Sequence, residues 1–163
     1  MKRRAYLDIE TTGLSRDYHD LTVIGIAIET NASIRLIQLI EDRLTDIRLF
    51  ETLAGVEELY TYNGSRFDLP FIKARLAADL RSAFKHTDLM YHCWKHNLKG
   101  GLKNVERLLN IPRKLKEVNG FMAVKLWWDY ANNNNRTSLK TLLDYNAEDV
   151  LNLITLRKLL AVE

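Results

Sequence analysis

The run Tyr6-Leu7-Asp8-Ile9-Glu10 places two carboxylates inside a segment that otherwise suits a buried β-strand. Side chains alternate between the two faces of a strand, so Asp8 and Glu10 point the same way and their carboxylates lie close together. Two like charges about 4 Å apart repel each other by roughly 4 kcal/mol at an effective dielectric constant of about 20. A divalent cation such as Mg²⁺ or Mn²⁺, which prefers hard oxygen ligands, would turn this repulsion into attraction. If the strand instead ends in solvent, both acids are simply hydrated. A metal site therefore requires further ligands elsewhere in the chain.

The length and composition are those of a globular protein. The chain has 163 residues, enough for one sizeable core, and we expect residues 1–163 to form a single domain. A content of 47% hydrophobic and 28% charged residues excludes wholesale disorder, and the net charge of +3 permits a polyanionic partner. The single cysteine, Cys93, excludes an internal disulfide. Because no apolar run approaches the length of a membrane span, we expect no membrane association and a cytoplasmic protein.

The pattern of apolar residues predicts an α/β fold. A strand over residues 5–9 is followed by a hairpin of two strands rich in β-branched residues. The hairpin strands cover residues 21–28 and 33–40, further strands are predicted over 59–62 and 84–90, and helices over 44–53, 102–109, 121–131 and from about 137 onward. The four asparagines at 132–135 are predicted to form a polar loop. We expect a mixed sheet covered by helices, with a site where strand ends converge.

Two further acids stand on predicted helices. The strand over 59–62 leads into Ser65, a candidate cap for a helix that carries Asp68 at its start. An acid in that position also interacts well with the helix dipole, without any other role. Tyr145 and Asp149 are four residues apart and share one face of the final helix. Asp149 lies beside the apolar stripe of that helix rather than opposite it, which argues against a purely solvated acid.

Three segments, in this order, resemble the three exonuclease motifs of the DEDD superfamily, which has the ribonuclease-H-like (DnaQ-like) fold. They are Leu7-Asp8-Ile9-Glu10-Thr11-Thr12-Gly13-Leu14, Tyr62-Asn63-Gly64-Ser65-Arg66-Phe67-Asp68-Leu69-Pro70 and Tyr145-Asn146-Ala147-Glu148-Asp149. A tyrosine four residues before the last aspartate resembles the DEDDy branch; the histidine branch has histidine five residues before it, where this chain has Asp144. Residues 101–113 further resemble the YprB-like group of predicted exonucleases. The resemblance covers nearly the whole chain.

This resemblance implies a five-stranded mixed sheet flanked by helices, with Asp8 and Glu10 on its central strand. It implies that four catalytic acids bind two divalent ions, Mg²⁺ or Mn²⁺, whose charge would cancel that of the carboxylates. These acids are Asp8, Glu10, Asp68 and Asp149. Tyr145 would lie beside the attacking water and, with an ordinary pKa near 10, orient it rather than take its proton. The implied reaction is hydrolysis of nucleic-acid phosphodiesters from the 3′ end, releasing nucleoside 5′-monophosphates.

The resemblance also suggests substrate contacts, and the implied partner is a single-stranded 3′ end of DNA or RNA. The loop residues Thr11, Thr12, Gly13 and Leu14, together with Asn63, match positions that meet the substrate in the family. Phe67 would either stack on a base or belong to the core. A basic run between residues 95 and 116 is either a strand-guiding surface or a solvated face, with Lys103 and Arg107 as the candidate substrate contacts. Its members are Lys95, Lys99, Lys103, Arg107, Arg113, Lys114 and Lys116, with Glu106 the single acid among them.

Two other functions remain open. A ribonuclease-H-like endonuclease also uses clustered acids, although the pairing of Tyr145 with Asp149 argues against it. A catalytically silent nucleic-acid-binding domain is disfavoured because all four acids and the tyrosine are present. His92, Cys93 and His96 are spaced to approach one another on a helix, which permits zinc, but a fourth ligand is missing.

Overall fold

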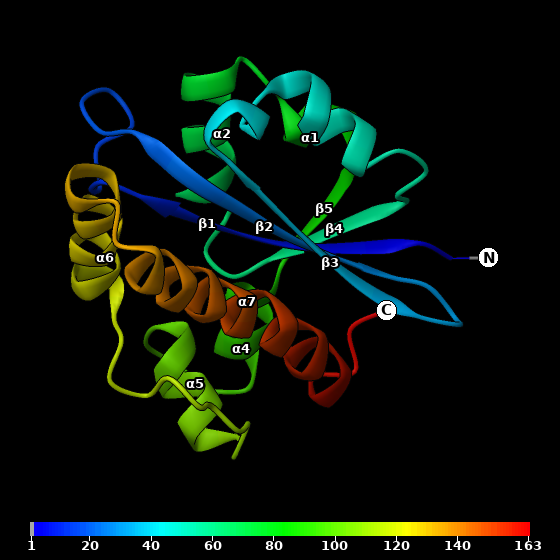
Figure 1. Cartoon of the computed structure of the whole chain (residues 1–163). Coiled ribbons are helices and arrows are strands. Elements are labelled where there is room, and N and C mark those ends of the chain that lie inside the picture. The colour runs from blue at the N-terminus through cyan, green and yellow to red at the C-terminus, as the bar shows by residue number, and fades with distance from the viewer. Residues whose placement is uncertain (1) are drawn as a thin grey trace.

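The computed structural model describes residues 2–163 and shows one five-stranded sheet with helices on both faces (Figure 1). The strands are β1 (Arg4–Thr11), β2 (Leu21–Glu29), β3 (Ile34–Ile40), β4 (Glu58–Thr61) and β5 (Lys85–Asp88), in the order β3-β2-β1-β4-β5. β2 is antiparallel to both β1 and β3, whereas β4 is parallel to both β1 and β5. The predicted mixed sheet is confirmed, with Asp8 and Glu10 on the central strand.

Seven α-helices and a 3₁₀ turn (Glu41–Arg43) connect and cover the strands in residues 2–163. The helices are α1 (Asp46–Thr52), α2 (Asp68–Leu76), α3 (Leu80–Ala83), α4 (Leu89–Lys95), α5 (Leu102–Leu108), α6 (Gly120–Asn133) and α7 (Arg136–Leu159). In Figure 1, α1 and α2 lie on one side of the sheet, and α4 to α7 lie on the other. Within the described residues, no helix is both long enough and apolar enough to cross a membrane. The cytoplasmic location stays a prediction.

The central strand β1 divides its side chains between these two layers. Leu7 and Ile9 belong to the core that α1 and α2 cover. Tyr6, on the opposite face, belongs to the core that α7 and α4 cover. Since alternate residues share a face, Asp8 and Glu10 lie on the side of Tyr6, beneath α7. The alternation thus aims both acids at the helix that carries Asp149.

α2 starts at Asp68 as predicted, but its predicted cap is wrong. The helix begins at Asp68, and its preceding residue, Phe67, makes no capping hydrogen bond through its side chain. Ser65 is therefore not the cap. Its backbone N–H instead donates to Asp88 Oδ2 at 3.0 Å, and the N–H of Asn63 donates to Asp88 Oδ1 at 2.8 Å. Asp88, at the end of β5, holds the segment that leads to Asp68.

Two element boundaries differ from the prediction. The strand predicted over 84–90 ends at Asp88, because its carboxylate accepts the N–H of Met90 at 3.1 Å and so starts α4. The asparagine run at 132–135 is no loop, since α6 continues to Asn133. Asn134 takes the left-handed conformation with φ of 52°, and Asn135 caps α7. These four residues end α6 and lead directly into α7.

Candidate active site

Three acids from two elements meet at the end of β1. Asp8 and Glu10 on β1 and Asp149 on α7 each offer a carboxylate oxygen, and these oxygens all lie within 4.8 Å of one another. They face a hollow of about 570 Å³, which we call the acidic hollow. The structure therefore brings together three of the four acids that the sequence singled out. Their oxygen donors suit Mg²⁺ or Mn²⁺.

The fourth acid, Asp68, lies directly behind this group. Its side chain is buried, and its Oδ1 accepts the N–H of Ile9 at 3.1 Å, which ties it to the backbone of β1 between Asp8 and Glu10. Asp68 is not one of the three acids within 4.8 Å of one another. Its charge nevertheless contributes to the raised pKa of both Asp8 and Glu10. Its role as a metal ligand stays a prediction.

The acids carry more negative charge than the surrounding protein neutralises. Burial, followed by the charges of Asp149 and Asp68, raises the pKa of Asp8 and of Glu10 well above their ordinary values. Burial also raises the pKa of Asp68 to about 7 and that of Asp149 to about 6. The protein alone therefore disfavours four ionised carboxylates here. A divalent cation would restore the ionised form.

Asp8 is held by residues whose part in the site the sequence did not reveal. Asn146 on α7 is fully buried, and its Nδ2 donates to the Asp8 backbone carbonyl at 3.3 Å and to Asp8 Oδ2 at 3.2 Å. Gln38 Nε2 on β3 donates to Asn146 Oδ1 at 3.0 Å. Gly25 pairs with Asp8 across the sheet, and a Cβ there would lie 2.1 Å from Asn146 Oδ1. The absence of a side chain at Gly25 thus leaves room for the Asn146 amide, whose hydrogen bonds orient Asp8.

Tyr145 also borders the acidic hollow, one helical turn before Asp149. Burial, followed by the charge of Asp149, raises the pKa of its hydroxyl further above the ordinary value. The hydroxyl therefore keeps its proton at neutral pH and can act as a hydrogen-bond donor. Two cations lie against its ring, with Lys103 Nζ at 5.0 Å and Arg113 Cζ at 5.1 Å from the centroid.

Arg113 departs from its predicted place on a basic surface. Its side chain is 6% exposed, and its Nη1 donates to both carboxylate oxygens of Glu106 at 3.0 Å. Its Nη2 donates to Asp149. The sequence could not show this, because Arg113 lies in a loop where no periodicity separates inward from outward residues. Arg113 and Glu106 belong to the site, not to a solvated face.

The predicted substrate residues fall into three places. The loop Thr11–Leu14 and Phe67 line the acidic hollow. Lys103 and Arg107 line a neighbouring hollow of about 560 Å³, which we call the basic hollow. Asn63 takes a left-handed conformation with φ of 60° at the end of β4 and is not among the residues that line the acidic hollow. The role of each in substrate binding stays a prediction.

The opposite wall of the acidic hollow comes from α6, which the sequence did not assign to the site. Phe121 there is 70% exposed, and Leu14, which also lines the hollow, is 86% exposed. Two large apolar side chains exposed beside buried carboxylates suit a flat apolar group such as a nucleobase. In the sequence, Phe121 at the start of the helix predicted over 121–131 was the feature that could have indicated this wall of the site.

Gly13 has a steric reason to be glycine. A Cβ at this position would lie 2.5 Å from the ring of His19. The ring in turn accepts the N–H of Ser15 through Nδ1 at 3.1 Å, which closes the loop upon itself. The glycine thus lets His19 brace the loop that borders the acids.

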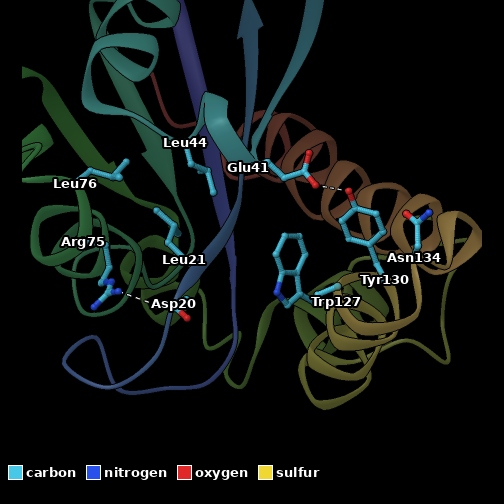
Figure 2. Close-up of a pocket in the computed structure, with 10 residues that line it drawn as sticks. Asp20, Leu21, Glu41, Leu44, Arg75, Leu76, Trp127, Tyr130 and Asn134 are labelled. Carbon is cyan, nitrogen blue, oxygen red and sulfur yellow. Dashed lines mark hydrogen bonds and ion pairs between the residues drawn. The ribbon is translucent and has the colours of Figure 1, made fainter.

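A third hollow, of about 580 Å³, is lined by the C-terminal part of α6 and also contains acids (Figure 2). Asp20 is paired with Arg75 at 2.8 Å, and Glu41 accepts a hydrogen bond from Tyr130. Figure 2 shows Trp127 and Tyr130 of α6 facing this hollow. Asp20 and Glu41 thus each have a side-chain partner. This hollow therefore does not collect unpaired buried carboxylates as the acidic hollow does.

The zinc site that the sequence permitted is not formed. In the part of the chain that the structure describes, the acids Asp8, Glu10 and Asp149 are the group whose ligand atoms converge, and His92, Cys93 and His96 form no such group. Cys93 is buried in the core between α4 and α7, and burial raises the pKa of its thiol to about 11. It is a core residue.

Comparison with known proteins identifies relatives of both sequence and fold. A family model described as RNase_H superfamily matches residues 5–161. The uncharacterised protein YprB of Bacillus subtilis (strain 168) is 29% identical over 174 aligned residues, which cover 93% of this chain and 40% of YprB. The chain thus spans less than half the length of this relative. The match confirms the resemblance to the YprB-like group.

Solved structures with the same fold include Brucella melitensis NrnC. It superposes with a TM-score of 0.64 at 20% sequence identity, over 97% of this chain and 72% of NrnC. NrnC with bound Mg²⁺ gives a TM-score of 0.60 at 20% identity, over 97% and 71% of the two chains. At this identity the likeness establishes the shared fold.

Proposed function

The chain belongs to the RNase_H superfamily, and from that premise we propose that it is a metal-dependent 3′-5′ exonuclease. The reaction would hydrolyse nucleic-acid phosphodiesters from the 3′ end to nucleoside 5′-monophosphates, with residues 1–163 forming one catalytic domain. The observation that carries the proposal is the convergence of Asp8, Glu10 and Asp149 beside Tyr145 in one hollow. Buried acids with raised pKa values in a hollow are typical of a functional site.

Four acids would hold the metal: Asp8, Glu10, Asp68 and Asp149. Two divalent ions, Mg²⁺ or Mn²⁺, would supply an acidified water for attack and stabilise the leaving oxygen. The raised pKa values support this assignment, because the site tolerates full ionisation only with added positive charge. The hydrogen bonds from Asn146 to Asp8 fix the orientation of one ligand.

Tyr145 would orient the attacking water. Its hydroxyl stays protonated, so it donates a hydrogen bond and cannot accept the proton from the water. Burial of the ring, and the two cations against it, hold Tyr145 beside Asp149. A donor held in this way restricts the water to a favourable direction of attack.

The terminal nucleotide of a single strand would occupy the acidic hollow. Its volume of about 570 Å³ lies within the usual range for small-ligand sites. Leu14 and Phe121 would contact the two faces of the base, and the loop Thr11–Gly13 would border the sugar and phosphate. The structures of NrnC with bound Mg²⁺ and bound to pGG support this combination of ion and oligonucleotide in the same fold.

The proposal is tested with 5′-labelled single- and double-stranded DNA and RNA, incubated with Mg²⁺, Mn²⁺ or EDTA. We expect a ladder that shortens from the 3′ end with metal and intact strands in EDTA. Asp149→Ala should be inactive. Asp144→Ala is the matched control and should remain active, because Asp144 is an exposed acid on the same helix, paired with Lys140 at 2.5 Å.

Two outcomes would contradict the proposal. Internal cleavage that ignores the 3′ end would indicate the ribonuclease-H-like endonuclease instead. Binding of nucleic acid without cleavage under either metal would indicate a silent binding domain.

A further inference from the structure

Arg113 places a fixed positive charge on a carboxylate that is also a candidate metal ligand. Its Nη2 donates to Asp149 Oδ1, and its Nε lies 3.7 Å from Glu148 Oε2. Among residues 2–163 it is the ion-pair partner of Asp149, while Asp8 and Glu10 form no ion pair. In the metal-free protein, Arg113 therefore supplies part of the charge that a divalent ion would supply. A metal that binds Asp149 has to compete with it.

The guanidinium of Arg113 is anchored without Asp149. Both carboxylate oxygens of Glu106 accept hydrogen bonds from Nη1 at 3.0 Å. Asn152 on α7 donates to Glu106 Oε1 at 2.9 Å and to the carbonyl of Pro112 at 3.3 Å. If Asp149 exchanges its partner, Arg113 retains Glu106 and stays at the site.

The loop that carries Arg113 is also fixed to α7 by its backbone. Glu148, next to Asp149, accepts the N–H of Lys114 at 2.9 Å and that of Leu115 at 3.3 Å. Glu148 thus binds the backbone of the loop, whereas Asp149 binds the guanidinium of Arg113. The side chain can change its partner while the loop keeps its place.

Arg113 also lines the basic hollow, together with its partner Glu106 and three further cations. Lys103, Arg107 and Lys116 line this hollow with Arg113, and none of these three forms an ion pair in the part of the chain that the structure describes. The Nε of Arg113 is buried and has no hydrogen-bond partner. Four cations and a single acid, Glu106, line this hollow of about 560 Å³, and this excess of positive charge suits a phosphate group.

We propose that Arg113 is a positioning residue that exchanges partners: it neutralises Asp149 in the metal-free protein, and when metal takes Asp149 it offers its released N–H groups to a substrate phosphate in the basic hollow. This inference rests on the proposed function. It couples the two hollows, because metal binding in one creates a phosphate donor in the other. Arg107 in the same hollow has no acid to release and binds phosphate irrespective of metal.

The test measures two affinities of Arg113→Gln. Calorimetric titration with Mn²⁺ and no nucleic acid should show binding about tenfold tighter than in the wild type, because the competing charge-assisted hydrogen bond is absent. Fluorescence anisotropy with a phosphorothioate-linked single strand in Ca²⁺ should show binding about tenfold weaker. In EDTA, the same strand should bind the variant and the wild type alike. A merely structural role for Arg113 would not give opposite changes that depend on metal.

Arg107→Gln is the matched control. It removes a cation from the same hollow and should weaken the strand equally in Ca²⁺ and in EDTA, with unchanged Mn²⁺ affinity. Arg113→Lys keeps a positive charge beside Glu106 and serves as the second variant if Arg113→Gln does not fold. Its Mn²⁺ affinity and its strand affinity should change in the same directions as in Arg113→Gln, but by less.

Several results would overturn the inference. They are an unchanged or weaker Mn²⁺ affinity in both Arg113 variants, and a loss of strand affinity that is equal with and without metal. If the wild type itself binds no Mn²⁺ and cleaves no substrate, the proposed function fails first. If the wild type does both and the Arg113 variants differ in neither affinity, only the partner exchange is wrong.

Discussion

The middle of α7 and its C-terminal end each contact a buried arginine, and the two surroundings differ in charge balance. Towards the C-terminus, Arg157 Nε donates to Tyr6 Oη at 2.6 Å, and Tyr6 donates to Glu29 Oε2 at 2.5 Å. Arg157 and Lys158 pair with Glu29 at 3.4 and 3.0 Å. One carboxylate there faces two cations and a phenol. This cluster is complete without any ligand.

The other buried arginine, Arg113, faces an excess of acids. Glu106, Glu148 and Asp149 contact it directly, and Asp8 and Glu10 lie next to Asp149. The same helix and the same strand, β1, thus contribute to two clusters: one whose single carboxylate is fully paired, the balanced end, and one with an excess of acids, the unbalanced end. The difference separates an ion pair that serves the fold from acids that require a ligand.

The largest effect should come from removing one charge at the unbalanced end. Asp8→Asn should abolish hydrolysis, because it removes a ligand on the central strand. Above about pH 7, the same change should raise the free energy of unfolding of the metal-free protein by about 1 kcal/mol, since the buried acids then repel less. Chemical denaturation in EDTA and the 3′-end assay measure the two effects. A variant that is less stable and still active would contradict this interpretation of the acids.

The balanced end should respond in the opposite way. Glu29→Gln leaves Arg157 buried without a counter-charge and should lower the free energy of unfolding by about 3 kcal/mol. Its hydrolytic rate at a temperature where it is folded should equal that of the wild type. Urea denaturation and the same assay decide this. Loss of activity in a folded Glu29→Gln would show that the two ends are not independent.

Tyr145→Phe should have a smaller effect on the unbalanced end. It removes the donor that orients the water and should lower kcat about tenfold, equivalent to one hydrogen bond. The affinity for Mn²⁺ should not change, because the phenol is not a ligand. Single-turnover kinetics and calorimetry separate these quantities. Unchanged turnover would remove Tyr145 from the mechanism.

The stability of the metal-free protein should also depend on pH. Asp68 and Asp149 have folded-state pKa values of about 7 and about 6, raised mainly by burial, against about 3.9 for an unfolded aspartate. The folded state therefore binds more protons between about pH 4 and 7, and its stability falls as the pH rises through this window. Thermal melts in EDTA across this range should show the decline. Melts of Glu29→Gln should show the same slope.

Local patterns in the sequence predicted the parts of the structure that depend on neighbouring residues. The alternation on β1 placed Asp8 and Glu10 on one face, and the spacing on α7 placed Tyr145 beside Asp149. The β-branched residues predicted the hairpin of β2 and β3, and the helical spacing of apolar residues predicted the long final helix. Each of these features depends only on residues that are near one another in the chain, so it can be inferred from the sequence alone.

Contacts between distant segments were not predictable in this way. Asn146 reaches Asp8 and Gln38 across more than a hundred residues, and nothing near Gly25 marks the space that it provides. Arg113 was expected on a surface because its neighbours in sequence are basic, whereas the fold turns it towards Asp149. Such contacts depend on the packing of α7 against the sheet.

Asp8, Glu10 and Asp149, together with Asp68, require a divalent cation, because the cations of the protein do not neutralise all of their negative charge. The most direct measurement is the melting temperature of the wild-type protein above pH 7, with Mg²⁺ or Mn²⁺ and with EDTA. Because a ligand that binds only the folded state stabilises it, the melting temperature should rise with metal and the rise should be lost in Asp8→Asn. An unchanged melting temperature at metal concentrations that support hydrolysis would contradict the claim.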